Sequence, residues 1–274
     1  MILDVKSYVE NRYEELKEVV RQLPSKPKLV ILRIGNDKAS ERYVRNKITR
    51  CEQVCIESEI IHLDENVDLQ NVLNIIETLN KNSNVTSVLL QLPLPCHLKK
   101  YEQMLTNAIE KDVDGFTIDN LGNLVQGTPK QIACTPKGIV NYLKHIGVDL
   151  KGKDVLIVNR STIVGKPLAL LMLQEDATVT IAHSKTKNLK DKCKQADIVI
   201  TAIGRANSFF AEDFKDNAIV VDVSINVDEN GKLCGDVCKS DYDKIHMVTP
   251  VPNGVGQMTV LSLIEQTIEM YFNR

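Results

Sequence analysis

The sequence predicts an α/β protein with two lobes, each built on a mostly parallel sheet. Three observations carry this prediction. Strand-like and helix-like segments alternate along the 274 residues. Largely apolar runs, such as 85–92 and 154–158, are typical of strands that are buried on both faces. The chain is also long enough to form one large domain or two small ones, and two is the better expectation.

The first hundred residues are expected to form a βαβαβ unit after an N-terminal helix. The amphipathic segment 4–23 predicts that helix, and Pro24 ends it. Pro93 and Pro95 stop the third strand, because proline cannot donate to a strand ladder. A helix over 98–110 follows, and the polar segment 119–127 reads as a crossing between lobes. The unit comprises strands at 29–35, 57–63 and 85–92 and helices at 40–54 and 69–80.

A second α/β series begins after residue 134. Thr135 is a plausible helix cap, and Pro136 suits the first helical position. The alternation then predicts a doubly wound sheet with right-handed crossovers, and Asp228-Glu229-Asn230-Gly231 predicts a hairpin turn. The expected strands are 154–158, 177–182, 197–203 and 218–223; the expected helices are 136–146, one ending at 175, 188–195 and 258–272.

Composition narrows the kinds of partner. A formal net charge of −2 without a basic block gives no footprint for nucleic acid or an anionic membrane. No apolar run reaches transmembrane length and the first residues do not resemble a signal peptide, so we expect a cytoplasmic protein with reduced cysteines. Cys234 and Cys238 lack a second ligand pair, so no metal is expected. Small molecules are the expected partners.

One helix face gathers proton-handling side chains. At about 100° per residue, Ser40, Tyr43 and Lys47 fall within roughly 60° of one another, and the charged residues fall on the far side. We therefore expect this face to point inward. Chance alone would give a Tyr-x-x-x-Lys pair about half the time in this composition. The position after a strand favours a ligand site, and a buried ammonium needs a partner or a role.

The turn 158–167 lies between a strand and a helix, where backbone N–H groups favour phosphate. Asn159 stands near the first glycine of the usual Gly-x-Gly-x-x-Gly and only Gly165 remains, so a plain tight turn is an equal alternative. No carboxylate follows the next strand. Arg160 and Ser184 could instead bind a 2′-phosphate, which favours NADP over NAD, although Ser184 could equally cap a helix.

Several ordered blocks together resemble the bifunctional methylenetetrahydrofolate dehydrogenase/cyclohydrolase (FolD) family over nearly the full chain. One of these blocks is 111–116, in which an acidic residue beside glycine has the character of a ligand contact. The blocks are 39–47 with Cys51-Glu52, Gln91-Leu92-Pro93-Leu94-Pro95, 111–116, Arg160-Ser161 through Gly165, His183-Ser184, and Thr249-Pro250-Val251-Pro252 through Met258-Thr259.

The resemblance implies a fold, two activities and a partner. It implies a catalytic folate-binding domain (1–120 plus 251–274, with the C-terminal helix returning to it), a Rossmann-like NAD(P)-binding domain (121–250), and a cleft at their junction. It also implies a homodimer through the cofactor domains. The enzyme would oxidise 5,10-methylenetetrahydrofolate to the methenyl form with NADP, and would then hydrolyse that form to 10-formyltetrahydrofolate. Both reactions belong to one-carbon metabolism and supply purine biosynthesis.

The resemblance also assigns site residues. Lys47 would take a proton from the attacking water, with Tyr43 and Gln91 positioning it and Asp114 binding the pterin. The implied substrate site adds Ser40, Leu92, Pro93, Pro252 and Gly254 to Tyr43, Gln91 and Asp114; the implied cofactor site comprises Asn159, Arg160, Ser161, Ile163, Val164, Gly165, His183, Ser184, Gly204 and Ile225.

Departures from the family pattern leave cofactor choice and relative rates open. Thr117-Ile118 replaces His-Pro, and Asn159 and Asn253 replace glycines. Gln257 replaces a proline that is favoured at a helix start. Two other readings are a short-chain dehydrogenase, which places its dinucleotide turn ahead of the Tyr-x-x-x-Lys helix, and a non-catalytic dinucleotide-binding regulator. The late position of turn 158–167 argues against the first, and the set Lys47, Gln91 and Asp114 argues against the second.

Overall fold

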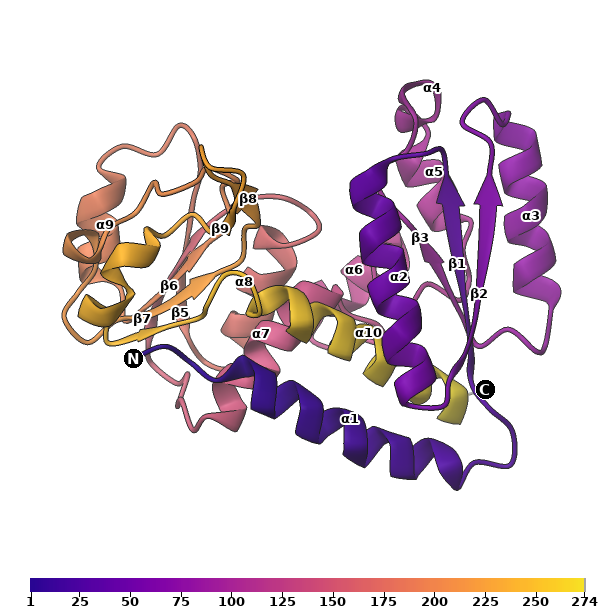
Figure 1. The fold of residues 1–274 in the computed structure, drawn as a ribbon, viewed down its shortest axis with the longest axis horizontal. Helices are drawn as coiled ribbons and strands as arrows, with labels where there is room; N and C mark the ends of the chain where they lie inside the picture. Colours follow the sequence, from indigo (N-terminus) through magenta and orange to yellow (C-terminus); the bar gives the residue numbers. More distant parts are fainter. Residues whose placement is uncertain (274) are drawn as a thin grey trace. The chain divides into compact units, whose positions relative to one another are not determined.

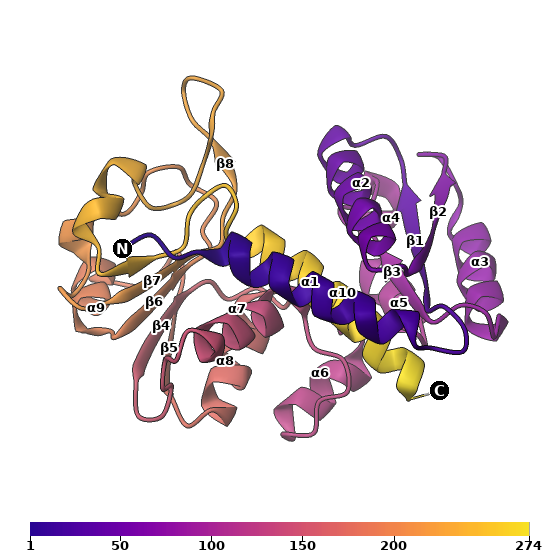
Figure 2. The ribbon, with the colours of Figure 1, turned by 60° about the horizontal axis from the view of Figure 1, so that its bottom comes forward.

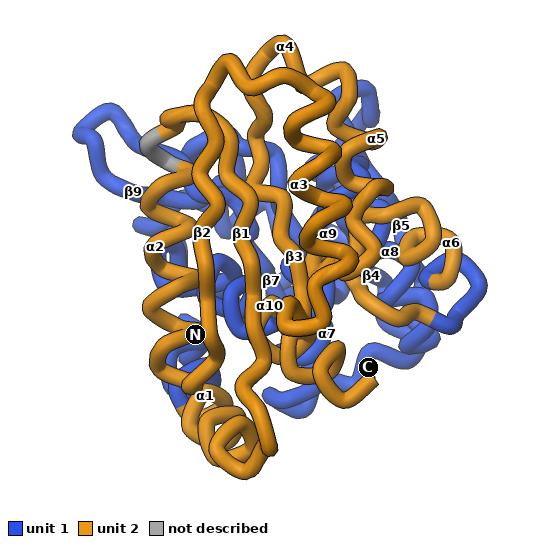
Figure 3. The backbone as a smooth tube through the Cα atoms, turned by 90° about the vertical axis from the view of Figure 1, so that its right-hand side faces the viewer, with its two compact units in different colours: residues 1–10, 124–128, 133–262 blue, residues 11–123, 129–132, 263–274 orange. Residues whose placement is uncertain are grey.

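A computed structural model describes residues 1–273, apart from the side chains of residues 38 and 39, so the side chain at the start of the 39–47 block lies outside the described part. The chain divides into two compact units, drawn in different colours in Figure 3. Unit 1 comprises residues 1–10, 124–128 and 133–262, and unit 2 comprises 11–123, 129–132 and 263–274. The expected two-domain α/β fold is confirmed.

Unit 2 carries a three-stranded parallel sheet in the order β2-β1-β3 (Figure 1). The strands are β1 (Lys28–Ile34), β2 (Glu57–Leu63) and β3 (Ser87–Leu90), and the helices α2 (Lys38–Gln53) and α3 (Leu69–Lys81) connect them. The expected βαβαβ unit is therefore present. Apolar strand residues pack against the inner face of α3, with Val30, Leu32, Val72, Ile76, Val88 and Leu90 all buried.

One expectation for the following segment is wrong, and a second is right in place but not in form. The helix expected over 98–110 is two short helices, α4 (Cys96–Lys99) and α5 (Glu102–Asn107), because the chain turns at Lys100 and Tyr101. The crossing between lobes expected at 119–127 is present, because unit 2 gives way to unit 1 at residue 124, but a helix, α6 (Ile118–Val125), and not a loop makes up most of it. The Thr117 hydroxyl accepts from the Asn120 N–H at 3.3 Å at the start of α6, and Leu124 is buried. Capping and burial outweigh the polar composition.

Unit 1 carries a five-stranded parallel sheet in the order β10-β7-β6-β4-β5. Figures 1 and 2 show α9 on one side of these strands and α7 and α8 on the other, as expected for a doubly wound sheet. The expected hairpin is the antiparallel pair β8–β9. The bounds are α7 (Cys134–His145), β4 (Asp154–Val158), α8 (Gly165–Gln174), β5 (Thr178–Ala182), α9 (Leu189–Gln195), β6 (Ile198–Thr201), η1 (Ala211–Asp213), β7 (Ile219–Asp222), β8 (Asn226–Val227), β9 (Leu233–Cys234), η2 (Lys239–Lys244) and β10 (Met247–Val248).

Thr135 does not cap α7. The helix begins at Cys134, and Ala133 occupies the cap position without a side-chain hydrogen bond. The Thr135 hydroxyl lies 2.8 Å from that of Thr259, on the C-terminal helix. A Cβ at Gly138 would come within 2.8 Å of Met258, so the two helices approach more closely than a larger residue would allow.

Two long helices contribute residues to both units, namely α1 (Val5–Arg21) and α10 (Val255–Phe272). In unit 2, the Gln266 amide donates to the carbonyls of Val113 (2.6 Å) and Ile132 (2.9 Å) and accepts from the Ile132 N–H (2.7 Å). The return of the C-terminal helix to the first lobe is thus confirmed. No helix in the described chain is both long enough and apolar enough to span a bilayer.

Candidate active site

Helix α2 starts directly after β1, and its start is fixed by Asp37. The Asp37 carboxylate accepts from the Ser40 N–H at 2.7 Å, and its backbone carbonyl accepts from the Arg33 guanidinium at 3.1 Å. Because Asp37 is the cap, Ser40 is not. The buried Ser40 hydroxyl instead donates to the Leu92 carbonyl at 3.4 Å, which links α2 to the loop after β3.

Lys47 meets Gln91 as the family resemblance implies. The half-buried Lys47 Nζ donates to Gln91 Oε1 at 3.0 Å, and Gln91 Nε2 donates to the Leu92 carbonyl at 2.7 Å. The second bond fixes the orientation of the amide, so its oxygen faces the lysine. In the described chain Lys47 has a neutral acceptor and makes no ion pair with a carboxylate. The following peptide bond, Leu92–Pro93, is cis, and Pro93 is exposed.

The prediction that the whole Ser40–Tyr43–Lys47 face points inward is wrong at Tyr43. Val44 and Cys51 are buried as expected, but 43% of Tyr43 is exposed. Its ring lies on the rim of the helix face, where it offers a free aromatic surface. Burial raises the pKa of the Cys51 thiol to about 12, although the charge of Lys47 opposes the shift, so Cys51 stays a thiol at neutral pH.

Asp114 lies in a turn organised by a second carboxylate that sequence reasoning missed. Segment 111–113 runs beside β3 through a parallel bridge between Val88 and Asp112. Buried Asp112 accepts from the N–H groups of Asp114 and Gly115 (both 3.1 Å) and Thr117 (2.9 Å), and from the Asn120 amide (3.1 Å). Burial raises the pKa of Asp112. Half-buried Asp114, beside Gly115, is therefore the candidate ligand residue, whereas buried Asp112 holds the turn in place.

Asn159 replaces the first glycine of the phosphate turn with a side chain that ties the turn together. Its Oδ1 accepts from the N–H groups of Ser161 (2.7 Å) and Gly165 (3.1 Å), and its Nδ2 donates to the Ala202 carbonyl (2.6 Å). The Ser161 hydroxyl accepts from the Val164 N–H at 3.1 Å. A Cβ at Gly165 would lie 2.2 Å from the Asn159 carbonyl oxygen, so only glycine fits there. This close packing of helix and strand is the role of the last glycine in dinucleotide folds.

A cavity of about 540 Å³ opens beside this turn, and the carboxyl ends of β4, β5 and β6 all contribute to it. It brings together five of the expected cofactor residues. Ser184 does not cap α9, whose cap position is Asn188. The lining comprises Val158, Asn159, Arg160, Ser161, His183, Ser184, Leu189, Ala202, Ile203 and Arg205.

The remaining expected cofactor residues do not line this cavity. Val164 and Gly165 belong to the same turn, and Ile163 is exposed there. Gly204 stands between two lining residues. Ile225 lies in the loop after β7, where its Cδ1 is 3.6 Å from the Cβ position at Gly256.

Sequence reasoning also missed two fully buried aspartates, Asp236 and Asp222, in unit 1. Asp236 accepts from the N–H groups of Ile203 (2.7 Å) and Arg205 (2.8 Å), from the Ser224 hydroxyl (2.8 Å) and from the Asn226 amide (3.0 Å). It therefore ties the loop after β6 to the loop after β7.

Asp222, at the end of β7, accepts in turn from the N–H groups of Asp236 (3.1 Å) and Val237 (2.8 Å). Burial raises the pKa of Asp222 to about 7, although these backbone hydrogen bonds oppose the shift. An acid at the end of the apolar run 218–223 was the one sequence signal that could have found it.

Pro252 and Gly254 belong to unit 1, whereas Lys47, Gln91 and Asp114 belong to unit 2. A Cβ at Gly254 would lie 2.1 Å from the Pro250 carbonyl oxygen. Asn253 adopts a left-handed conformation (φ 75°), which asparagine tolerates. Its Oδ1 accepts from Gln257 at 3.3 Å, so the two departures from the family pattern contact each other.

The fold and the cavity define a dinucleotide-binding α/β protein, in which a parallel sheet with a phosphate turn accompanies a second unit that carries a lysine–glutamine pair. The chain belongs to the tetrahydrofolate dehydrogenase/cyclohydrolase family. The model of the family's catalytic domain matches residues 3–114, and that of its NAD(P)-binding domain matches residues 133–274. The resemblance seen in the sequence is confirmed, and the short-chain dehydrogenase and regulator readings are set aside.

Individual relatives match over nearly their whole length. The bifunctional protein FolD of Streptococcus thermophilus is 43% identical over 277 residues, covering 98% of this chain and 96% of the relative. The crystal structure of the bifunctional enzyme FolD from Campylobacter jejuni is 40% identical with a TM-score of 0.96, covering 100% of this chain and 99% of the other. FolD of Trypanosoma brucei, complexed with NADP cofactor and inhibitor, is 31% identical with a TM-score of 0.91, covering 100% and 97%. Within the described residues, no group of three or more His, Cys, Asp or Glu side chains could hold a metal ion.

Proposed function

We propose that this chain oxidises 5,10-methylenetetrahydrofolate to 5,10-methenyltetrahydrofolate with NADP, and then hydrolyses the methenyl form to 10-formyltetrahydrofolate. The observation that carries the proposal is the Lys47–Gln91 hydrogen bond of 3.0 Å in a chain that matches both domains of the family. Relatives at 43% identity are named for two activities, and one related structure was solved with NADP.

The oxidation requires positioning more than proton transfer. NADP, when bound, supplies the hydride acceptor. The product cation is stabilised by its own two nitrogens, so the protein's task is to hold the folate in place. Asp114, in the turn that Asp112 organises, is suited to accept from the amino and ring N–H groups of the pterin. The exposed ring of Tyr43 is free to stack on the folate.

The hydrolysis requires a base. Water adds to the methenyl carbon and loses one proton, which leaves a hydroxyl adduct. The hydroxyl then loses its proton as the formyl C=O forms, the bond from that carbon to N5 breaks and N5 takes up a proton. The Lys47 amine is the group we assign to the proton transfer from the attacking water. Gln91 accepts a hydrogen bond from Lys47 and carries no charge that would compete for its proton, as a carboxylate would. The Leu92 carbonyl in turn accepts from the Gln91 amide and fixes its position. Ser40 donates to the same carbonyl and so supports the geometry from α2. Leu92 and Pro93 complete this wall of the folate site.

The cofactor cavity is suited to NADP. Arg160 and Ser184 line it from the ends of β4 and β5, and the lining contains no aspartate or glutamate that would bind an unphosphorylated ribose. A guanidinium and a hydroxyl can both donate to a 2′-phosphate. Asn159, Ser161 and Gly165 would present the turn's backbone to the pyrophosphate.

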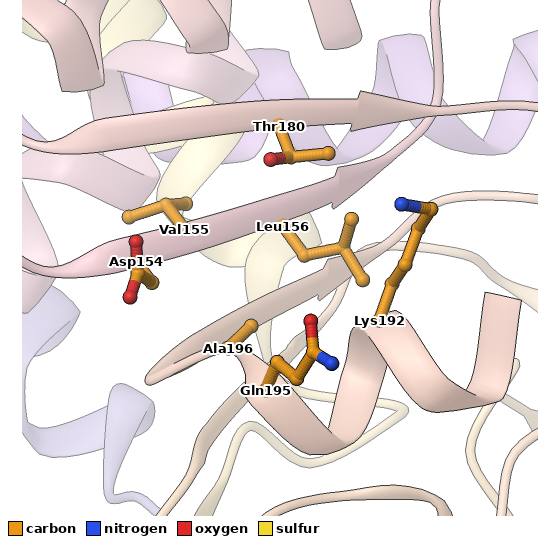
Figure 4. A pocket seen from close by; sticks show the side chains of 7 residues that line it. All are labelled: Asp154, Val155, Leu156, Thr180, Lys192, Gln195 and Ala196. Carbon is orange, nitrogen blue, oxygen red and sulfur yellow. The ribbon is translucent and has the colours of Figure 1, made fainter.

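We also propose a homodimer through unit 1. Strand β5 is the edge of the five-stranded sheet, and Ile181 on it is 40% exposed. A shallow groove of about 170 Å³, lined among others by Thr180 and Lys192, lies next to this edge (Figure 4). An unpaired edge can pair with the same edge of a second copy about a two-fold axis. Ile181→Lys should give a monomer in light scattering, and an unchanged dimer would contradict this surface.

Two further assignments stay proposals. We assign residues 1–120 with 251–274 to the folate-binding domain and 121–250 to the cofactor domain. We also assign the protein to the cytoplasm.

The test of the proposed function is an assay of the purified protein with methylenetetrahydrofolate and either NADP or NAD. We expect reduction of NADP, followed by loss of the methenyl absorbance as the ring opens. No reduction of either cofactor would overturn the assignment, and a clear preference for NAD would overturn the roles of Arg160 and Ser184.

A further inference from the structure

Arg205 is a second guanidinium in the cofactor cavity. It follows β6 and lines the cavity together with Arg160, which follows β4. Neither guanidinium makes an ion pair or a hydrogen bond with any other group in the described part of the chain. Both side chains are exposed. Two unpaired cations therefore share one cavity that is already suited to a dinucleotide.

The backbone of Arg205 is held firmly, although its side chain is free. Asp236, which is fully buried, accepts from the Arg205 N–H at 2.8 Å and from the Ile203 N–H at 2.7 Å. Gly204 lies between them at φ +70°, and its N–H donates to the Ser224 hydroxyl at 3.0 Å. The Asp236 carboxylate thus fixes where the arginine starts, at the edge of the cavity.

The charges around Arg205 favour an anion on its cavity side. The 540 Å³ cavity has no acidic residue in its lining. A smaller cavity of about 340 Å³ adjoins it and shares Leu189, Ile203 and Arg205 with it. Asp191 and Lys190 line that smaller cavity, and Lys190 pairs with Asp213 at 2.9 Å.

We propose that Arg205 is a specificity-determining residue that binds the 2′-phosphate of NADP together with Arg160 and Ser184. The proposal rests on the proposed function, because it assumes that this cavity takes the adenosine end of NADP. Guanidinium groups bind phosphate through directed, charge-assisted hydrogen bonds, and two of them can share its terminal oxygens. The apolar side chains of Leu189 and Ile203 would then face the adenine ring.

Two other roles for Arg205 predict different behaviour. A guanidinium stacked on the adenine ring would strengthen NAD and NADP equally. A guanidinium on the pyrophosphate would do the same, since both cofactors carry that group. Only a contact with the 2′-phosphate distinguishes the two cofactors.

The test is calorimetric titration of the full-length protein with 2′,5′-ADP and with 5′-ADP. Loss of one charge-assisted bond to phosphate predicts that Arg205→Gln weakens 2′,5′-ADP binding by roughly 10- to 100-fold and 5′-ADP binding by less than about threefold. Arg205→Lys should restore part of the loss. Lys187→Gln is the matched control, because Lys187 is an exposed cation of the neighbouring loop that does not line the cavity; we expect no change.

Equal weakening of both nucleotides in Arg205→Gln, or no weakening of either, would overturn the proposal. Thermal melts of each variant report whether folding is intact. If the wild-type protein binds 2′,5′-ADP no more tightly than 5′-ADP, the proposed NADP preference itself fails. In the oxidation assay, Arg205→Gln should raise KM for NADP and leave kcat at saturating NADP unchanged.

Discussion

Gly165→Ala tests the geometry of the phosphate turn. An added Cβ would lie 2.2 Å from the carbonyl oxygen and 2.5 Å from the carbonyl carbon of Asn159. Ordinary contacts begin near 3.4 Å, so the start of α8 must move by roughly 1 Å. Such overpacking costs about 1–3 kcal/mol, which corresponds to a fall in Tm of about 2–12 °C for a unit of this size. The shift also moves the turn's N–H groups, so KM for NADP should rise.

Gly122→Ala is the control for this substitution. Gly122 lies inside α6, and a Cβ there meets no heavy atom within 4 Å. Alanine should therefore stabilise the helix by about 0.5–1 kcal/mol. Differential scanning fluorimetry with and without NADP measures both variants. A Gly165→Ala protein that melts like the wild type and keeps its KM for NADP would refute the reasoning.

Three further substitutions test other parts of the account. Folded Asp222 keeps its proton up to about pH 7, whereas an unfolded aspartate loses it near pH 3.8. The free energy of unfolding of the wild-type protein should therefore fall by up to about 4 kcal/mol as pH rises from about 3.8 to about 7. Urea unfolding of Asp222→Asn should lack this pH-dependent loss, and an identical pH slope in both proteins would contradict the role of Asp222. Gln91→Leu removes the acceptor of Lys47, so the hydrolysis rate should fall roughly 10- to 100-fold in a stopped-flow assay, while an unchanged rate would exclude the hydrogen bond from the mechanism. Asp112→Asn leaves at least one buried N–H unpaired, so we expect the free energy of unfolding to fall by about 1–3 kcal/mol and KM for folate to rise. If the variant shows neither effect, Asp112 does not hold the Asp114 turn.

Local signals predicted most of the fold. Largely apolar runs such as 154–158 and the helix period of segments such as 69–80 act within a few residues, so strands and helices could be placed from the sequence. Helix α6 could not, because its start depends on Thr117 and on the buried carboxylate of Asp112, and because Gly122 and the polar residues suggested a loop. The break between α4 and α5 likewise carries no glycine or proline to announce it.

The site was predictable where motif and helix period agreed. Spacing placed Lys47 on the buried side of α2, and the resemblance paired it with Gln91, a contact the structure contains. Tyr43 is more exposed than expected, because the helix period predicts the direction in which a side chain points but not whether neighbouring elements cover it. Asp236 and Arg205 lie 31 residues apart in sequence, so their hydrogen bond is visible only in the folded chain.

The central claim is that Lys47 serves the hydrolysis and that hydride transfer depends on positioning. The direct measurement is the rate of methenyltetrahydrofolate hydrolysis by Lys47→Ala, beside its rate of methylenetetrahydrofolate oxidation with NADP. Arg45→Ala, which removes an exposed cation of the same helix, is the matched control. We predict that Lys47→Ala loses about 10²- to 10⁴-fold in hydrolysis while oxidation stays measurable and the control keeps both rates. Unchanged hydrolysis by Lys47→Ala would contradict the account.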